Sequence, residues 1–77
     1  MKMKFNKAEV GDRIASNLRK IRDSYGCTQT EMSKKCQIND RMYNLWENGY
    51  VMPSTLGLLT LSEALGISMD DLVKKEL

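Results

Sequence analysis

The fold is decided by residues 28–49, which read TQTEMSKKCQINDRMYNLWENG. Thr28 is a helix-capping residue, and the acidic Glu31 follows at the third helical position, where it suits the helix dipole and returns a hydrogen bond to the cap. Met32 lies four residues before Cys36, so both belong to one apolar face. These features predict a short helix from Gln29 to Cys36.

A second short helix is predicted from Asp40 to about Asn48. Asn39 precedes it as a capping residue, and Gly49 follows it as a helix-ending glycine. Only residues 37–39 separate the two helices. Short helices joined by so tight a turn do not easily lie antiparallel, so we expect them to cross steeply.

The rest of the chain predicts three more helices. The first runs from about Lys7 to Tyr25, the fourth opens at Pro53 and Ser54, and the last runs from Met69 to about Lys75. Their apolar faces consist of Val10, Ile14, Leu18, Ile21 and Tyr25; of Leu58, Leu61 and Leu65; and of Leu72 and Val73. Because no segment alternates with period two over a useful length, we predict an all-α, compact five-helix bundle without strands.

Four of the predicted helices begin with the same local device. An apolar residue precedes the cap and another follows four positions after it, which is the hydrophobic staple. The residues are Phe5, Asn6 and Val10; Cys27, Thr28 and Met32; Ile38, Asn39 and Tyr43; and Ile67, Ser68 and Leu72. We therefore expect well-defined helix starts.

Length and composition favour one domain, spanning residues 1–77 with a core from about residue 7 to residue 75. Hydrophobic residues make up 42% of the chain and charged residues 29%, which is ordinary for a soluble globular protein. No apolar run approaches the roughly 20 residues of a membrane helix, and the start lacks the apolar stretch of a secretory signal. We expect a cytoplasmic protein without membrane contact.

Cys27 and Cys36 are the only cysteines, and the chain has no histidine. Zinc-ligand spacing is therefore absent, and we interpret both cysteines as small buried apolar side chains. Paired carboxylates in a cleft-forming context and a glycine-rich phosphate loop are missing as well. We expect no metal, no cofactor, no small-molecule ligand and no enzymatic activity.

Charge is unevenly distributed along the chain. Residues 1–41 hold ten Lys or Arg against five Asp or Glu, whereas residues 42–77 hold two against five. Two interpretations stay open: the basic half faces phosphates while the other half faces away, or the charges form an ordinary solvated surface.

Four motifs stand at characteristic separations: Thr28-Gln29 with Glu31; Trp46-Glu47-Asn48-Gly49; Pro53-Ser54; and Ala64-Leu65-Gly66-Ile67-Ser68 with Asp70 and Leu72. Through them the chain resembles, without a gap from about Leu18 to Leu72, the Xre or Cro-like helix-turn-helix domains of phage repressors and their bacterial relatives. The resemblance implies five helices, with the second and third forming the helix-turn-helix. It also implies binding in the DNA major groove and, commonly, a dimer on a two-fold site.

The third helix is the expected reader of bases, because a helix fits the major groove and each base pair shows a distinct pattern there. With Tyr43 and Trp46 directed inward, the residues that face outward are Asn39, Asp40, Arg41, Met42, Asn44 and Leu45. Among them Arg41 suits guanine and Asn44 suits adenine, while Met42 or Leu45 suits a thymine methyl group.

The resemblance also implies contacts with the DNA backbone. It places Gln29 against a phosphate, with Thr28 beside it at the start of the second helix, and it implies further backbone contacts from Asn48 and Tyr50. For Thr28 and Asn39 the alternative remains that they are only helix caps.

Arg22 and Glu47 match a pair that this family uses to connect the first helix with the third. We interpret the pair as a structural clamp that holds the reading helix. The alternative role for Arg22 is a phosphate contact.

Several residues depart from the family pattern. Gln37 stands where a turn glycine is usual, so a positive φ there costs about 1 kcal/mol. Tyr43 replaces a branched aliphatic residue, and its hydroxyl needs a partner or an exit to solvent. Asp40 repels phosphates, although it suits the helix dipole and can accept from a cytosine amine. Met42 and Leu45 make the reading face unusually apolar.

The resemblance implies a sequence-specific double-stranded DNA-binding transcriptional regulator, a repressor that acts as a homodimer. We expect the dimer to form through the C-terminal helices, where Leu56, Leu59 and Met69 lie off the core face. The alternative is a protein-interaction module, such as an antitoxin or adaptor with the same fold, because an apolar and partly acidic reading face also suits a protein partner.

Overall fold

The structure, a computed structural model, describes residues 4–77, and these residues form five α-helices and no strand. The helices are α1 (Lys7–Tyr25), α2 (Gln29–Lys35), α3 (Asp40–Glu47), α4 (Thr55–Leu65) and α5 (Met69–Lys74). The predicted all-α five-helix fold is confirmed. Three helices end one residue earlier than predicted, because the expected last residues are the caps Cys36, Asn48 and Lys75.

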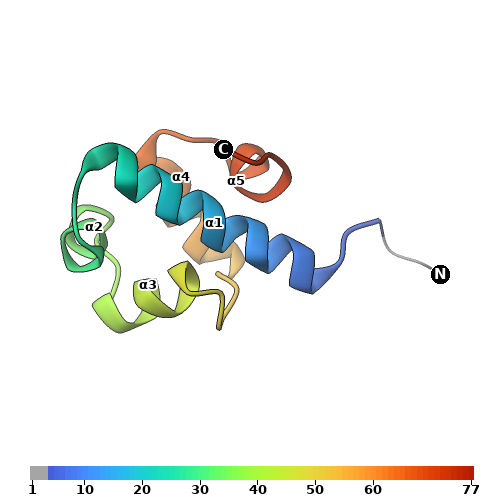
Figure 1. Cartoon of the computed structure of the whole chain (residues 1–77), viewed down its shortest axis with the longest axis horizontal. Helices are drawn as coiled ribbons and strands as arrows, with labels where there is room; N and C mark the ends of the chain where they lie inside the picture. Colours follow the sequence, from blue (N-terminus) through green and yellow to red (C-terminus); the bar gives the residue numbers. More distant parts are fainter. Residues whose placement is uncertain (1–3) are drawn as a thin grey trace.

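The long helix α1 runs along the middle of the molecule, and the other helices are arranged around it (Figure 1). It packs against α3 and against α5, while α2 packs on α3 and α4 packs on α5. In Figure 1, α2 is seen nearly end-on and α3 lies close to the plane of the view. The two short helices therefore cross steeply, as predicted.

Every helix begins at a polar residue whose side chain accepts a hydrogen bond from the first turn. These residues are Asn6, Thr28, Asn39, Ser54 and Ser68. At α2 the capping box is complete: the Thr28 backbone N–H donates to Glu31 Oε1 at 2.9 Å, and the Glu31 backbone N–H donates to Thr28 Oγ1 at 3.1 Å. The bond from the Thr28 backbone also lowers the pKa of Glu31.

The turn between α2 and α3 keeps a left-handed residue although no glycine occupies it. Gln37 has a φ of 56° and is the one non-glycine residue in the range 4–77 with a positive φ. Its N–H donates to the Lys34 carbonyl at 3.1 Å, and the Ile38 N–H donates to the Ser33 carbonyl at 2.9 Å. This pair of bonds is the Schellman motif, so the turn retains its geometry at the cost of backbone strain.

Replacing Gln37 with glycine should therefore stabilise the protein. We expect the free energy of unfolding to rise by about 0.5 to 1 kcal/mol, because relief of the left-handed strain exceeds the extra chain entropy of glycine. Urea denaturation measures the change. The matched variant Gln37→Ala keeps the strain and should show no such gain. Equal stability of the glycine variant and wild type would show that the turn is unstrained.

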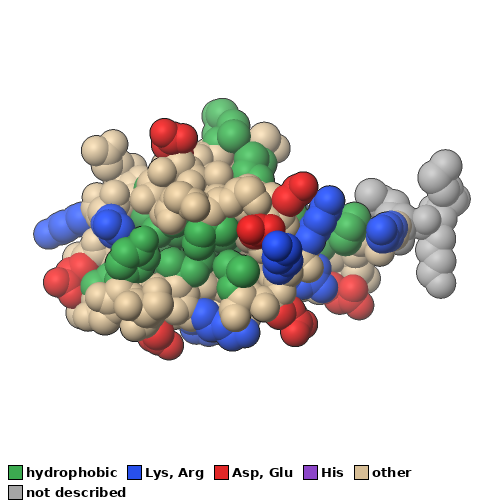
Figure 2. Space-filling model, turned by 90° about the horizontal axis from the view of Figure 1, so that it is seen from above, with side chains coloured by type: hydrophobic (Ala, Val, Ile, Leu, Met, Phe, Trp, Pro, Cys, Tyr) green, Lys and Arg blue, Asp and Glu red, His purple; other side chains and the backbone are tan. Residues whose placement is uncertain are grey.

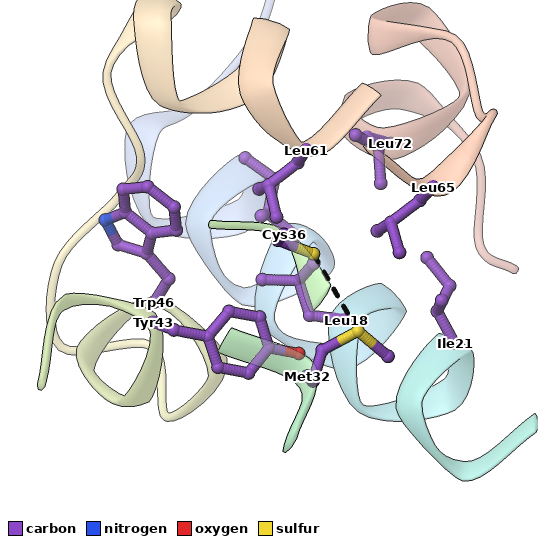
Figure 3. Packing of buried hydrophobic residues seen from close by; sticks show 10 residues of the cluster. Leu18, Ile21, Met32, Cys36, Tyr43, Trp46, Leu61, Leu65 and Leu72 are labelled. Carbon is purple, nitrogen blue, oxygen red and sulfur yellow. Dashed lines mark hydrogen bonds between the residues drawn. The ribbon is translucent and has the colours of Figure 1, made fainter. Parts of the chain in front are cut away.

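The core draws side chains from all five helices. Figure 3 shows the Tyr43 ring pointing into this core among leucine side chains from the neighbouring helices. The buried cluster consists of Ile14, Leu18, Ile21, Met32, Cys36, Tyr43, Trp46, Leu61, Leu65 and Leu72. Cys36 is 2% exposed and its Sγ lies 3.8 Å from the Met32 Sδ, so it is the buried apolar side chain that we expected.

Two core predictions were wrong. Cys27 is only half-buried, because it lies in the connection between α1 and α2 at the rim of the core. Tyr25 is 48% exposed, since it occupies the last position of α1, past the helices that cover the apolar stripe. Its ring instead lies 4.8 Å from the Lys35 ammonium group, a cation–π contact between the ends of α1 and α2.

Sequence reasoning overlooked a buried polar residue that attaches the C-terminal segment to α1. Asn17 is fully buried, and its Nδ2 donates to the carbonyls of Leu72 and Lys75, each at 2.8 Å. Its Oδ1 accepts from the Leu77 N–H at 2.9 Å. Because a buried amide needs such partners, Asn17 specifies where α5 and the following residues lie.

Candidate nucleic-acid interface

One face of α3 is immobilised by the core. Tyr43 and Glu47 are fully buried and Trp46 is 7% exposed, a spacing that directs all three to one side of the helix. The Trp46 indole lies against Gly57 of α4, so closely that a Cβ added there would be 2.8 Å from Trp46 Cη2. The opposite face of α3 is therefore presented to solvent in a fixed orientation.

The residues predicted to read bases all belong to this solvent side. Asn39, Asp40, Arg41, Met42 and Asn44 are exposed, and Leu45 is half-buried. Within residues 4–77 the Arg41 guanidinium makes no hydrogen bond and no ion pair, which leaves its donors available for a ligand. Met42 is 41% exposed, so the face combines a cation, amides and apolar atoms.

Asn39 and Asp40 also have partners within the protein. The Asn39 Oδ1 accepts from the Met42 N–H at 3.2 Å as the cap of α3. The Asp40 Oδ1 lies 3.1 Å from the Oγ of the buried Ser33, which is also 2.7 Å from the Thr30 carbonyl. One hydroxyl hydrogen serves one of these acceptors at a time. The contact connects the start of α3 to α2.

Arg22 and Glu47 form an ion pair between α1 and the end of α3. The Arg22 Nε lies 2.8 Å and 3.0 Å from the two carboxylate oxygens, and Nη2 lies 2.8 Å from Oε1. The remaining nitrogen, Nη1, donates to the Cys27 carbonyl at 3.0 Å. Since the Glu47 side chain has no exposed surface, the pair depends on these charge-assisted bonds to offset its desolvation.

The environment of this pair alters two ionisations. Burial alone would raise the pKa of Glu47, but hydrogen bonds from Arg22 and Gln29 outweigh it, so the pKa lies below its ordinary value. Burial raises the pKa of the Tyr43 phenol, and the Glu47 charge raises it further. The Tyr43 hydroxyl makes no hydrogen bond within residues 4–77, so Glu47 acts on it through charge.

A second arginine, which sequence reasoning missed, also holds the end of α3. Arg19 Nη1 donates to the Glu47 carbonyl at 2.7 Å, where a cation complements the negative end of the helix dipole. The sequence spacing could have indicated this role. Arg19 and Arg22 stand three residues apart on α1, so both side chains project to the same side of the helix.

Three amide side chains connect the buried pair to the exposed face of α3. Gln29 Nε2 donates to Glu47 Oε1 at 3.2 Å, and Gln29 Oε1 accepts from Asn44 Nδ2. Asn44 Oδ1 in turn accepts from Asn48 Nδ2 at 2.9 Å. The structure thus brings together Gln29 and Asn48, predicted as backbone contacts, with Asn44, predicted as a base contact.

The other two predicted backbone residues lie apart from this chain of amides. Thr28 is exposed and occupied as the cap of α2. Tyr50 is 77% exposed just after α3, where its N–H donates to the Leu45 carbonyl at 3.0 Å. Its ring projects into solvent.

Neither a metal centre nor a membrane segment emerges from residues 4–77. No group of three or more His, Cys, Asp or Glu side chains in that range is arranged to hold a metal ion. None of the helices there combines the length and the apolar character that a membrane-spanning helix requires.

A steeply crossed helix pair whose second helix presents a fixed, solvent-exposed face is typical of DNA-binding helix-turn-helix proteins. The helix-turn-helix family model matches residues 18–72, the span over which the sequence resembles the Xre and Cro-like domains. The chain therefore belongs to this family of DNA-binding regulators, whose members are typically not enzymes. Comparison with curated proteins and with solved structures found no match.

Proposed function

We propose that this protein is a sequence-specific repressor that reads the major groove of double-stranded DNA with α3 and acts as a homodimer. The observation that supports the proposal most strongly is the fixed orientation of α3, whose buried residues Tyr43, Trp46 and Glu47 leave Arg41 and Asn44 directed to solvent. A pre-positioned reading face lowers the entropy lost on binding. The whole chain acts as one domain in this proposal.

The proposed contacts lie at exposed or half-buried positions. The base-reading residues are Asn39, Asp40, Arg41, Met42, Asn44 and Leu45, and the backbone-contacting residues are Thr28, Gln29, Asn48 and Tyr50. Repression follows from occupancy, because a DNA-bound domain blocks other proteins from the same site.

The proposed dimer rests on apolar side chains that the core does not cover. Leu56 is 74% exposed and Leu59 is 50% exposed on α4, and Met69 at the start of α5 is half-buried. On the side of the molecule away from α3, Figure 2 shows hydrophobic side chains gathered between acidic and basic ones.

Sedimentation should show a dimer in the presence of DNA. A monomer at high protein concentration, free and on DNA, would remove this part of the proposal.

A titration of mixed-sequence duplex at several salt concentrations separates DNA binding from the alternative, a protein-interaction module. Contacts with phosphates release counterions, so each of them contributes about −0.9 to the slope of log affinity against log salt. We expect a steep slope. Absence of measurable DNA binding at low salt would favour the protein-interaction module instead.

Replacing Arg41 with alanine should weaken binding to the preferred duplex by about 1 to 3 kcal/mol and relax one position of the recognised sequence. Arginine bonds two acceptors on guanine, and Arg41 lies in the first turn of α3, where side chains of this docking mode reach base edges. Binding to a scrambled duplex should hardly change. Equal losses on both duplexes, with a salt slope reduced by about one, would instead make Arg41 a phosphate contact.

A further inference from the structure

The hydrogen bonds that leave the buried Glu47 carboxylate run in a single direction. Glu47 accepts from Gln29, Gln29 accepts from Asn44, and Asn44 accepts from Asn48. The chain begins at a fully buried side chain of the core and ends at an exposed residue that caps α3. It therefore links the interior of the protein to its reading face.

The direction follows from the chemistry of the first member. A carboxylate can only accept hydrogen bonds, so Gln29 must turn its NH₂ group toward Glu47 and its oxygen away. That oxygen can only accept, so Asn44 must turn its NH₂ group toward Gln29. The Asn44 oxygen is then the atom that meets the Asn48 NH₂ group. An amide without such a partner has two nearly equivalent orientations.

We propose that Gln29 is a positioning residue that transmits the orientation imposed by Glu47 to the side-chain amides of Asn44 and Asn48. This inference rests on the proposed function, because it assigns the amide order to DNA recognition by α3. Gln29 and Asn44 each keep one N–H and one acceptor site beyond the bonds of the chain, and Asn48 keeps one N–H and both acceptor sites of its oxygen. The order of the chain decides which of these groups face the ligand. The role extends the phosphate contact that the family resemblance implies for Gln29.

The first test examines the amides without DNA. In the variant Gln29→Met, which keeps the side-chain length but removes both polar atoms, the side-chain NH₂ signals of Asn44 and Asn48 in a ¹H–¹⁵N spectrum should shift toward those of solvent-exposed asparagines. The control Thr30→Ala alters an exposed neighbour on α2 and should leave both signals in place. Unchanged Asn44 and Asn48 signals in Gln29→Met would overturn the proposal.

A second variant guards against a folding defect in Gln29→Met. Asn44→Asp changes an exposed residue and replaces a donor with an acceptor that the Gln29 oxygen cannot satisfy. The Gln29 NH₂ signal should stay in place in this variant, because Glu47 still accepts from that amide and fixes its orientation. A Gln29 NH₂ group that turns toward the new Asp carboxylate at position 44 and leaves Glu47 would contradict the orientation imposed by Glu47.

The DNA test is a double-mutant cycle on the preferred duplex. Gln29→Met and Asn44→Ala should each weaken binding by about tenfold. The double variant should lose clearly less than the product of the two single losses, because part of the Gln29 loss acts through Asn44 while its phosphate contact is independent. Losses that multiply in full would limit Gln29 to the phosphate contact and overturn the positioning role. If wild type prefers no duplex at all, the proposed function fails, whereas the amide signals still decide whether Gln29 orients Asn44.

Discussion

Replacing Glu47 with alanine should lower the free energy of unfolding by about 3 to 4 kcal/mol, because removing one partner of a buried ion pair leaves the other uncompensated. The energetic penalty for leaving Arg22 without its partner is reduced, because 22% of the Arg22 side chain is exposed and stays in contact with water. The Gln29 amide loses its acceptor too. Chemical denaturation of both proteins at neutral pH measures the difference.

The pH dependence of Glu47→Gln provides the control for charge. The folded pKa of Glu47 lies below its ordinary value of 4.5, so the pair contributes its stability above that pH and loses it as pH falls toward the folded pKa. The glutamine variant should therefore be less stable at pH 7 and should lose less stability than wild type on acidification. If wild type and Glu47→Gln lose stability in parallel on acidification, the charge of Glu47 does not stabilise the contact with Arg22.

Replacing Gly57 with alanine should destabilise the protein by about 1 to 3 kcal/mol, although alanine is the better helix former. The new Cβ would lie 2.8 Å from Trp46 Cη2, 2.9 Å from Trp46 Cζ2 and 3.3 Å from Pro53 Cβ. Trp46 is buried and cannot yield without displacing α3. Thermal unfolding followed by circular dichroism measures the effect.

Gly11→Ala is the matched control for this substitution. Gly11 lies inside α1, and a Cβ there would meet nothing within 4 Å. Alanine should therefore stabilise the protein by about 0.5 to 1 kcal/mol through helix propensity and chain entropy. If Gly57→Ala stabilises the protein as Gly11→Ala does, the close approach of Trp46 to Gly57 does not occur.

Helix starts could be predicted from the sequence because capping is local. A cap, its acidic partner and the staple all lie within six residues, so Thr28 and Asn39 determine where α2 and α3 begin without information from the rest of the chain. The buried face of α3 was predictable for the same reason, because Tyr43 and Trp46 stand at helical spacing.

Long-range contacts were not predictable in this way. Asn17 and Gly57 look like an ordinary polar residue and a weak helix former, and their roles appear only once Leu72 and Trp46 are brought against them. The amide chain depends on atoms from two helices, α2 and α3, so no spacing in the sequence indicates that Gln29 reaches both Glu47 and Asn44. Tyr25 shows the converse, since helical spacing predicted burial that its place at the helix end prevents.

Selection of bound sequences from random DNA duplexes tests the central claim, sequence-specific reading of DNA by α3, most directly. We expect wild type to enrich a two-fold symmetric motif whose half-sites lie about 10 base pairs apart, the spacing of one helical turn. Arg41→Ala should enrich the same motif with one position relaxed. Failure of wild type to enrich any motif under low-salt conditions that support binding would contradict the account.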